Sequence, residues 1–198
     1  ITDVLAGGIE TPEENTYQFL IEKLFKEVIH TEKFHKVWNT FCMDIIKPFF
    51  NENKVVIQKL PSIKIFVSGQ NWRFVEPVKK KNNRYVNLHT ETNYPYCHPC
   101  FETNFIVPLI DMDEDNGLFV DNIFCTPSHG EVLIFDQVEH GGYVKNVSKN
   151  TRVSIDFKGC AYTQYNFELL SENIFAKKRG KWIKQTELFT IGNYYRMI

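Results

Sequence analysis

The pattern of apolar and polar positions predicts two amphipathic helices in residues 1–52. Thr11 and Glu14 form a capping-box sequence, so we expect the first helix to begin there. A second helix is expected to begin at Thr31 and to end at Pro48, because proline does not fit the interior of a helix. Each segment carries one apolar stripe, formed in the first by Tyr17, Leu20, Ile21, Leu24, Phe25 and Val28, and in the second by Phe34, Val37, Trp38, Phe41 and Ile45. We expect both helices to cover a sheet.

A β-rich segment follows in residues 53–160. Its strand-like stretches are short, contain many β-branched and aromatic residues, and are separated by Gly, Pro, Asn or Asp. The expected strands are KVVIQKL, SIKIFVSG, RYVNLHTE, TNFIVPLI, GLFVDNIF, GEVLIFDQ and TRVSIDFKG. No helical pattern separates them, so we expect a mostly antiparallel arrangement, as in a sandwich, jelly roll or barrel.

The pattern is weaker in the C-terminal extension, residues 161–198. The stretch NIFAKKRGKWIKQ predicts a hairpin that turns at Arg179-Gly180, and ELFTIGNYYRMI predicts a last strand or a packing tail. A chain of 198 residues is long enough for one domain with a substantial core. We therefore expect residues 1–198 to form a single domain, mostly β with flanking helices.

Composition narrows the functional classes. The net charge is −1 and no basic stripe is visible, so we expect no nucleic-acid partner. No apolar run is long enough to cross a membrane, so no membrane partner is expected. The five cysteines lack the even, regular pattern of a disulfide scaffold, which favours a reducing, cytoplasmic compartment. The run Lys79–Lys81 is expected to be a solvated loop.

The stretch YVNLHTETNYPY places a histidine and a carboxylate two residues apart, and alternate side chains of a strand face the same side. The expected shared face consists of Tyr85, Asn87, His89 and Glu91. His89 and Glu91 could thus hold one metal ion. The third ligand is expected in His140, which follows the strand GEVLIFD and precedes two glycines that allow a tight turn or the close approach of a ligand. Two imidazoles and one carboxylate form the facial triad of non-heme Fe(II) oxygenases.

A candidate carboxylate receptor lies further along the chain. In the expected strand TRVSIDF, Arg152 and Ser154 share one face. Arginine offers a planar fork of donors and serine adds one more, a combination that suits the far carboxylate of an organic-acid cosubstrate.

The order of HTE at 89–91, His140 and RVS at 152–154 resembles the HxD/E…H…RxS signature of the Fe(II)/2-oxoglutarate-dependent oxygenases. The blocks HTETNYPYCHPCFETNFIVPL and HGGYVKNVSKNTRVSIDFK are similar to blocks of small-molecule members of the streptomycin-biosynthesis type. The resemblance covers roughly residues 62–158, and the helices and the C-terminal extension carry no motif of their own.

The resemblance implies a double-stranded β-helix core, a cupin-like jelly roll, with Fe(II) bound by His89, Glu91 and His140. It implies 2-oxoglutarate and O2 as cosubstrates, with 2-oxoglutarate held by Arg152 and Ser154. The implied activity is hydroxylation of a C–H bond of a small-molecule substrate. The superfamily usually has Asp where this chain has Glu91, but a carboxylate is retained. Halogenating members carry a small residue there, so hydroxylation is expected rather than halogenation.

Further residues are expected near the cosubstrate. Asn104 lies on the strand face opposite Phe105 and resembles a position that can contact the cosubstrate, although it could equally be a core residue bonded to backbone. Tyr85 shares the ligand face and could contact cosubstrate or substrate. Lys64 and Phe66 share a strand face and could line the pocket, but any of these residues could simply be packed in the sheet.

Other interpretations stay open. Cys97-His98-Pro99-Cys100 allows a structural zinc site or a redox-active dithiol, but a zinc site usually needs a second ligand pair at a regular distance. We therefore expect this segment to belong to a loop that helps cover the substrate. The rival functions are a cupin-type metal enzyme without 2-oxoglutarate and a non-catalytic binding or sensor domain.

Overall fold

The computed structural model describes residues 23–25, 27–69, 79–81, 83–93, 95–178 and 181–198. The helix start expected at Thr11 and the turn expected at Arg179-Gly180 lie outside these residues. The helices are α3 (Glu32–Phe41), a π-helix (Cys42–Ile46), α4 (Lys47–Phe50), a 3-10 helix (Phe167–Leu169) and α5 (Gln185–Leu188). The strands are β1 (Val55–Gln58), β2 (Ser62–Phe66), β3 (Lys79–Lys81), β4 (Arg84–His89), β5 (Thr103–Pro108), β6 (Leu118–Val120), β7 (Ile123–Cys125), β8 (Leu133–Phe135), β9 (His140–Tyr143), β10 (Arg152–Ala161), β11 (Phe175–Lys178), β12 (Lys181–Lys184) and β13 (Tyr195–Met197).

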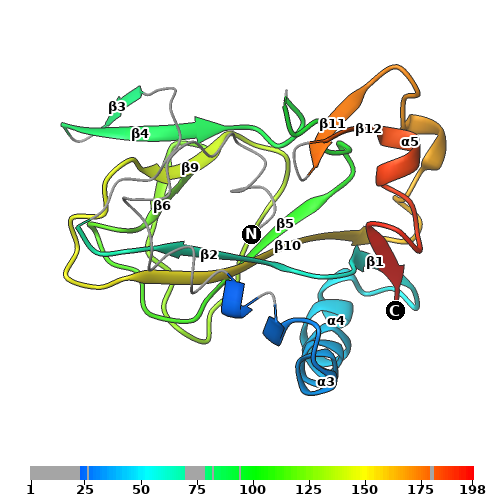
Figure 1. The fold of residues 1–198 in the computed structure, drawn as a ribbon, viewed down its shortest axis with the longest axis horizontal. Helices are drawn as coiled ribbons and strands as arrows, with labels where there is room; N and C mark the ends of the chain where they lie inside the picture. Colours follow the sequence, from blue (N-terminus) through cyan, green and yellow to red (C-terminus); the bar gives the residue numbers. More distant parts are fainter. Residues whose placement is uncertain (1–22, 26, 70–78, 82, 94, 179–180) are drawn as a thin grey trace.

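Two sheets contain most of the strands of the described chain, and the strands paired in them are antiparallel. The first sheet has the order β13-β1-β10-β5-β8, and β2 also pairs with β10. The second has the order β3-β4-β9-β6-β7. In Figure 1, β2 and β10 lie in one layer and β4 and β9 in another. The expected β-rich, antiparallel fold with flanking helices is thus confirmed.

The chain passes repeatedly between the two sheets. From β2 to β10, the strands β2, β5, β8 and β10 belong to the first sheet, and β3, β4, β6, β7 and β9 belong to the second. Alternate residues of β10 therefore face either the second sheet or the outside of the first. The face that lies toward the second sheet lines the candidate site.

The N-terminal helices cover the outer face of the first sheet, as expected (Figure 1). Thr31 caps α3, because its hydroxyl accepts a hydrogen bond from the backbone N–H of Phe34 at 3.2 Å. Trp38 of α3 meets Phe157 of β10 edge to face, with ring centroids 4.8 Å apart. Phe157 in turn stacks on Phe105 of β5 at 4.9 Å. These aromatic contacts fix the outer face of β10 and leave its other face for polar residues.

The predicted end of the second helix was wrong. The helical run continues through the π-helix into α4, where Pro48 occupies the first turn, a position that tolerates proline. It ends at Asn51, which has a left-handed backbone. Val37 and Ile45 are mostly exposed rather than part of the buried stripe. For Ile45 the wider π-turn is the reason, since it brings Ile46 to the sheet in place of Ile45.

The strand pattern needs three further corrections. GLFVDNIF is not one strand but the β6–β7 hairpin, because Asp121 and Asn122 adopt positive φ angles and turn the chain. Lys79–Lys81 forms strand β3 rather than a loop. Strand β9 had no counterpart among the predicted strands, because two glycines interrupt its pattern.

One of these glycines brings two strands unusually close. A Cβ atom at Gly141 would lie 1.8 Å from the backbone oxygen of Asn87 in β4. Only glycine fits there, so β9 can place His140 directly beside the end of β4. The glycines were expected to allow a tight turn or the approach of a ligand, but the close neighbour of Gly141 is the backbone of β4.

The C-terminal extension packs at one end of the sheets. β11 and β12 form the expected hairpin, and β13 adds a strand beside β1. Phe189, Tyr194 and Tyr195 belong to a buried cluster with Val56 and Cys160. None of the helices in the described part of the chain is long and apolar enough to cross a membrane.

Candidate metal centre

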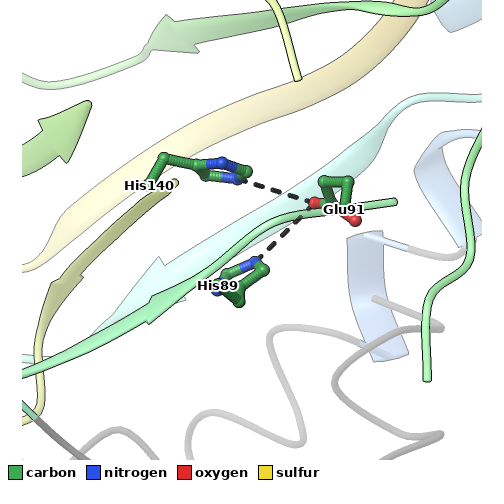
Figure 2. A group of neighbouring side chains, drawn as sticks. All are labelled: His89, Glu91 and His140. Atoms are coloured by element: carbon green, nitrogen blue, oxygen red, sulfur yellow. Dashed lines mark ion pairs between the residues drawn. The ribbon is translucent and has the colours of Figure 1, made fainter. Parts of the chain in front are cut away.

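The three expected metal ligands lie together where β4 and β9 meet. His89 is the last residue of β4, and it pairs across the sheet with His140, the first residue of β9. Their imidazole centroids are 4.7 Å apart. Glu91 lies in a turn two residues beyond the end of β4, so the expectation that it shares the strand was wrong. The turn nevertheless brings its carboxylate back to the two histidines (Figure 2).

One oxygen of Glu91 faces both imidazoles. Its Oε1 lies 3.8 Å from Nε2 of His89 and 3.7 Å from Nε2 of His140. One donor atom from each of the three side chains lies within 4.8 Å of the others. This is a compact arrangement of two imidazoles and one carboxylate, the donor set of a facial triad.

The orientation of His140 suits a metal ligand. Its Nδ1 lies 3.0 Å from the backbone oxygen of Val138, and because a carbonyl can only accept, Nδ1 carries the proton and donates. Nε2 then presents a lone pair toward Glu91 and His89. Metal-binding histidines are commonly fixed in this way through their second nitrogen.

The electrostatic environment keeps His89 and Glu91 in the protonation states that bind a metal. Burial lowers the pKa of His89, against opposing contributions from Glu91, so its imidazole favours the neutral form. Burial alone would raise the pKa of Glu91. The charge of Lys158, the neighbouring imidazoles of His140 and His89 and the charge of His98 outweigh burial, and the pKa of Glu91 lies well below its usual range. Glu91 is therefore a carboxylate at neutral pH.

A pocket between the sheets connects these ligands with the expected carboxylate receptor. Its polar lining residues include His89, Glu91, His140, Arg152, Lys64 and Asp156, and its less polar ones include Tyr96, Ile106 and Leu118. Lys64 thus lines the pocket as anticipated. A polar end at the ligands and an apolar wall are typical of small-molecule sites.

Arg152 is buried on the face of β10 that lines this pocket. One of its terminal nitrogens donates to the backbone oxygen of Asn116 at 2.8 Å, and its guanidinium carbon lies 5.2 Å from the ring centroid of Phe66. Its Nε is buried and has no hydrogen-bond partner among the described residues. Burial lowers the pKa of Arg152 to about 10, although the charge of Asp156 opposes the shift. Arg152 is thus a cation with an unused donor.

Ser154 does not stand free beside Arg152 as expected. Its hydroxyl donates to Oδ1 of Asp156 at 2.7 Å, and Ser154 is not among the residues that line the pocket. Because Ser154 has one O–H, that donor is already used. Asp156 was not anticipated, although the alternation of the strand places it on the same face as Arg152 and Ser154.

The two weaker site predictions differ in outcome. Tyr85 is 61% exposed and does not line the pocket, because it lies at the other end of β4 beside β3. Its expected contact with cosubstrate has no support. Asn104 is buried and its amide donates to the backbone oxygen of Asp136 at 3.2 Å, which is the packed alternative. It also lines a smaller cavity with Glu91 and His140.

Sequence reasoning missed two residues that contact Glu91. Lys158 lies on the inward face of β10, and its Nζ is 3.3 Å from Oε1 of Glu91. His98 is buried, and its Nε2 is 3.8 Å from Oε2 of Glu91. Strand alternation from Arg152 could have found Lys158. For His98, the signal in the sequence was Glu102 four residues later, a spacing at which the two side chains can meet.

The cysteines of the CxxC segment do not converge on one point. Cys97 is buried and Cys100 is exposed, and both are free thiols. His98, between them, is directed toward Glu91 and Glu102. Among the described residues, the cluster with metal-binding geometry is the one formed by His89, Glu91 and His140.

No protein-family model matches this chain, and no curated protein sequence matches it either. The geometry of the site and the sequence motifs are therefore the basis for inferring its function.

Proposed function

We propose that this protein is a non-heme Fe(II)/2-oxoglutarate-dependent dioxygenase that hydroxylates a C–H bond of a small metabolite. The single observation that carries the proposal is the convergence of His89, Glu91 and His140 in a pocket that also contains buried Arg152. The sequence order HxE, His and RxS supports the same assignment.

The donor set fits a ferrous ion. Two neutral imidazoles and one carboxylate leave open positions on an octahedral metal, as a cosubstrate and O2 require. His89 and His140 come from paired strands, so the sheet holds their relative position. Glu91 supplies one negative charge through Oε1.

Arg152 fits the distal carboxylate of 2-oxoglutarate. A buried donor without a partner is energetically costly, and Nε of Arg152 is such a donor. A carboxylate ligand would accept a charge-assisted hydrogen bond from it. Arg152 is also held by Asn116 and Phe66, so its side chain is ordered before a ligand binds.

The strand order supports a double-stranded β-helix core. Two four-stranded parts have the orders β2-β10-β5-β8 and β4-β9-β6-β7, and the chain passes back and forth between them. In a jelly roll, two antiparallel sheets face each other in this way. The proposed metal site then lies between the sheets, near the ends of β4 and β9.

The protein's own residues bind and orient, while the bound groups carry the oxidation. When bound, Fe(II) and 2-oxoglutarate supply the oxidation of a C–H bond by O2, with release of succinate and CO2. The hydrogen bond from His140 to Val138 keeps one imidazole aligned. The apolar wall of Ile106 and Leu118 excludes water and offers packing surface to a small substrate.

One observation favours a second candidate, a cupin-type metal enzyme that uses no 2-oxoglutarate. Asp156 lines the same pocket and accepts a hydrogen bond from Ser154, so a carboxylate of the protein already lies near Arg152. A second carboxylate there would meet electrostatic repulsion. We still favour the 2-oxoglutarate-dependent enzyme over the cupin-type enzyme, because Nε of Arg152 is a buried donor without a partner among the described residues.

The proposal is tested by measuring succinate formed from 2-oxoglutarate in the presence of Fe(II) and O2, with a panel of small metabolites as substrates. The parent protein is expected to produce succinate, and His140→Ala is expected to produce none. His129→Ala, at an exposed loop position, is the matched control and should behave like the parent. Absence of succinate from the parent, with metal bound, would favour the cupin-type alternative.

A further inference from the structure

A chain of buried polar side chains connects the C-terminal extension with the candidate metal ligand Glu91. The hydroxyl of Tyr195 in β13 donates to Oε1 of Glu102. The other carboxylate oxygen of Glu102 lies 2.8 Å from Nδ1 of His98. Nε2 of His98 faces Oε2 of Glu91 at 3.8 Å. The path thus runs from Tyr195 through Glu102 and His98 to Glu91.

The chain lies in a part of the protein where polar groups are costly. Tyr195 and Glu102 are 0% and 1% exposed, and His98 is 6% exposed. A buried carboxylate requires compensating partners, and even well-paired buried ions often stabilise a fold no better than apolar residues would. Stability alone is therefore a poor explanation for three polar residues placed in series behind Glu91.

His98 is held rigidly by its surroundings. Its backbone N–H donates to the backbone oxygen of Glu91 at 2.8 Å, so the chain between these two residues folds back and brings His98 beside Glu91. The imidazole packs against the rings of Phe189 and Tyr194, whose centroids are 4.8 and 5.6 Å away. Gln185 donates to the backbone oxygen of Cys97 at 2.7 Å and fixes the same turn.

The two oxygens of Glu91 have different partners. Oε1 faces His89 and His140, whereas Oε2 faces His98. Glu91 lies beyond the end of β4, so the sheet does not fix its side chain as it fixes the two histidines. A glutamate also has one more rotatable bond than the aspartate that it replaces in the superfamily signature. Its carboxylate therefore needs an external anchor.

We propose that His98 is a positioning residue that carries a proton on each ring nitrogen, because the carboxylates on both sides of it can only accept. Its Nε2–H then holds Oε2 of Glu91, so that only Oε1 is presented to a metal bound by His89 and His140. Glu102 and Tyr195 act through His98 by orienting its imidazole. The C-terminal extension thereby contributes to the metal centre without providing a ligand. This inference rests on the proposed metal site, and it goes beyond it by assigning a role to residues outside the motifs.

The first test measures metal affinity and coordination rather than turnover. Co(II) is titrated into the metal-free protein, and its absorption bands in the visible range report both affinity and ligand arrangement. Loss of an outer partner of a metal ligand typically weakens binding by about 10–100-fold, so we expect that loss for His98→Ala, together with altered bands. His98→Gln keeps an N–H donor near the position of Nε2 and is expected to restore most of the affinity. His129→Ala is the control.

The second test asks whether Tyr195 acts through His98. Tyr195→Phe removes one oxygen and keeps the aromatic packing, so it is expected to fold and to bind Co(II) a few-fold more weakly than the parent. In the His98→Ala background the same change should have no further effect, since the connection to Glu91 is already cut. Equal effects of Tyr195→Phe in both backgrounds would overturn the series arrangement.

The outcomes separate this inference from the proposed function. If the parent binds Co(II) and forms succinate while His98→Ala and Tyr195→Phe bind Co(II) as tightly as the parent with unchanged bands, the positioning role is wrong and the metal site stands. If the parent and the His140→Ala variant both fail to bind Co(II), the proposed site and the positioning role are both overturned. Should His98→Ala not fold, unchanged Co(II) affinity in Tyr195→Phe still decides against the inference.

Discussion

Nζ of Lys158 lies 3.3 Å from Oε1 of Glu91, the same carboxylate oxygen that faces His89 and His140. An ammonium ion thus stands where Glu91 would offer a lone pair to a metal. A metal cation and Lys158 compete for this oxygen, because two positive charges a few ångströms apart repel. Lys158 is a buried cation that keeps Glu91 ionised in the metal-free protein.

Replacing Lys158 by methionine should strengthen metal binding. The variant keeps an unbranched side chain and removes the competing charge, so we expect roughly tenfold tighter Co(II) binding, about 1.4 kcal/mol. The measurement is a Co(II) titration of the parent and the variant at neutral pH. Lys149→Met, at an exposed position, is the control and should leave the affinity unchanged. Weaker binding in Lys158→Met would mean that this lysine supports the metal site rather than competing with it.

The lowered pKa of Glu91 predicts a pH dependence of stability in the metal-free protein. Since the folded-state pKa lies below the usual value of 4.5, ionised Glu91 stabilises the fold above that value, and this contribution is lost as the pH falls through the folded-state pKa. Glu91→Gln should therefore be less stable than the parent near neutral pH, and the difference should shrink in acid. Urea unfolding of both proteins across this range measures it. A difference that is constant with pH would contradict the lowered pKa.

Gly141→Ala should destabilise the protein strongly. The added Cβ would meet the backbone oxygen of Asn87 at 1.8 Å, and a backbone atom cannot move aside cheaply. We expect a loss of about 3 kcal/mol or more, at the upper end of overpacking costs. Gly130→Ala is the matched control, because its φ is also positive but nothing lies within 4 Å of the added atom. Its cost should be about 1–2 kcal/mol. Equal losses of free energy of unfolding would remove the argument that Gly141 permits close strand pairing.

Much of the fold could be predicted because it depends on local patterns. Short β-branched stretches predicted most of the strands, and Thr31 predicted the start of α3. The failures occurred where tertiary contacts decide. Strand β9 contains two glycines and is a strand only because β4 and β6 pair with it. Pro48 lies in a helical turn because a π-turn precedes it.

In the candidate site, too, local patterns predicted some residues, whereas those that depend on tertiary contacts were missed. His89, His140 and Arg152 could be placed from strand periodicity and order, and the structure brings them to one pocket. The role of His98 could not be derived, because Phe189, which packs against it, and Tyr195, which binds its partner Glu102, lie in the distant C-terminal extension. Tyr85 was misplaced because strand alternation gives the face of a residue but not where along the strand the pocket ends.

Asp156→Asn should tighten the binding of 2-oxoglutarate. The change removes a negative charge from the pocket wall near Arg152 and keeps an oxygen that can accept the hydrogen bond from Ser154. We expect a several-fold gain in affinity, since like charges in a partly buried pocket repel. The gain should be seen in the 2-oxoglutarate concentration that half-saturates the Fe(II) protein. A loss of binding would instead give Asp156 a direct role with a cationic part of a ligand.

The central claim, that this pocket binds 2-oxoglutarate through Arg152, is tested most directly by one titration. The absorbance that appears when 2-oxoglutarate chelates protein-bound Fe(II) is followed under nitrogen for the parent, Arg152→Ala, Arg152→Lys and Ser154→Ala. Removing one partner of a buried charge pair costs roughly 2–5 kcal/mol, so Arg152→Ala should bind about thirty-fold to a few thousand-fold more weakly. Arg152→Lys should recover only part of this loss, because lysine lacks the planar fork.

In the same titration, Ser154→Ala should change the 2-oxoglutarate affinity little, since its hydroxyl already donates to Asp156. Fe(II) affinity without 2-oxoglutarate should stay near the parent value in all three variants, because neither residue is a ligand. If Arg152 binds 2-oxoglutarate, Arg152→Ala should lose much of its 2-oxoglutarate affinity and keep its Fe(II) affinity. Equal 2-oxoglutarate affinity in the parent and Arg152→Ala would contradict it and would favour a cupin-type enzyme that uses no 2-oxoglutarate.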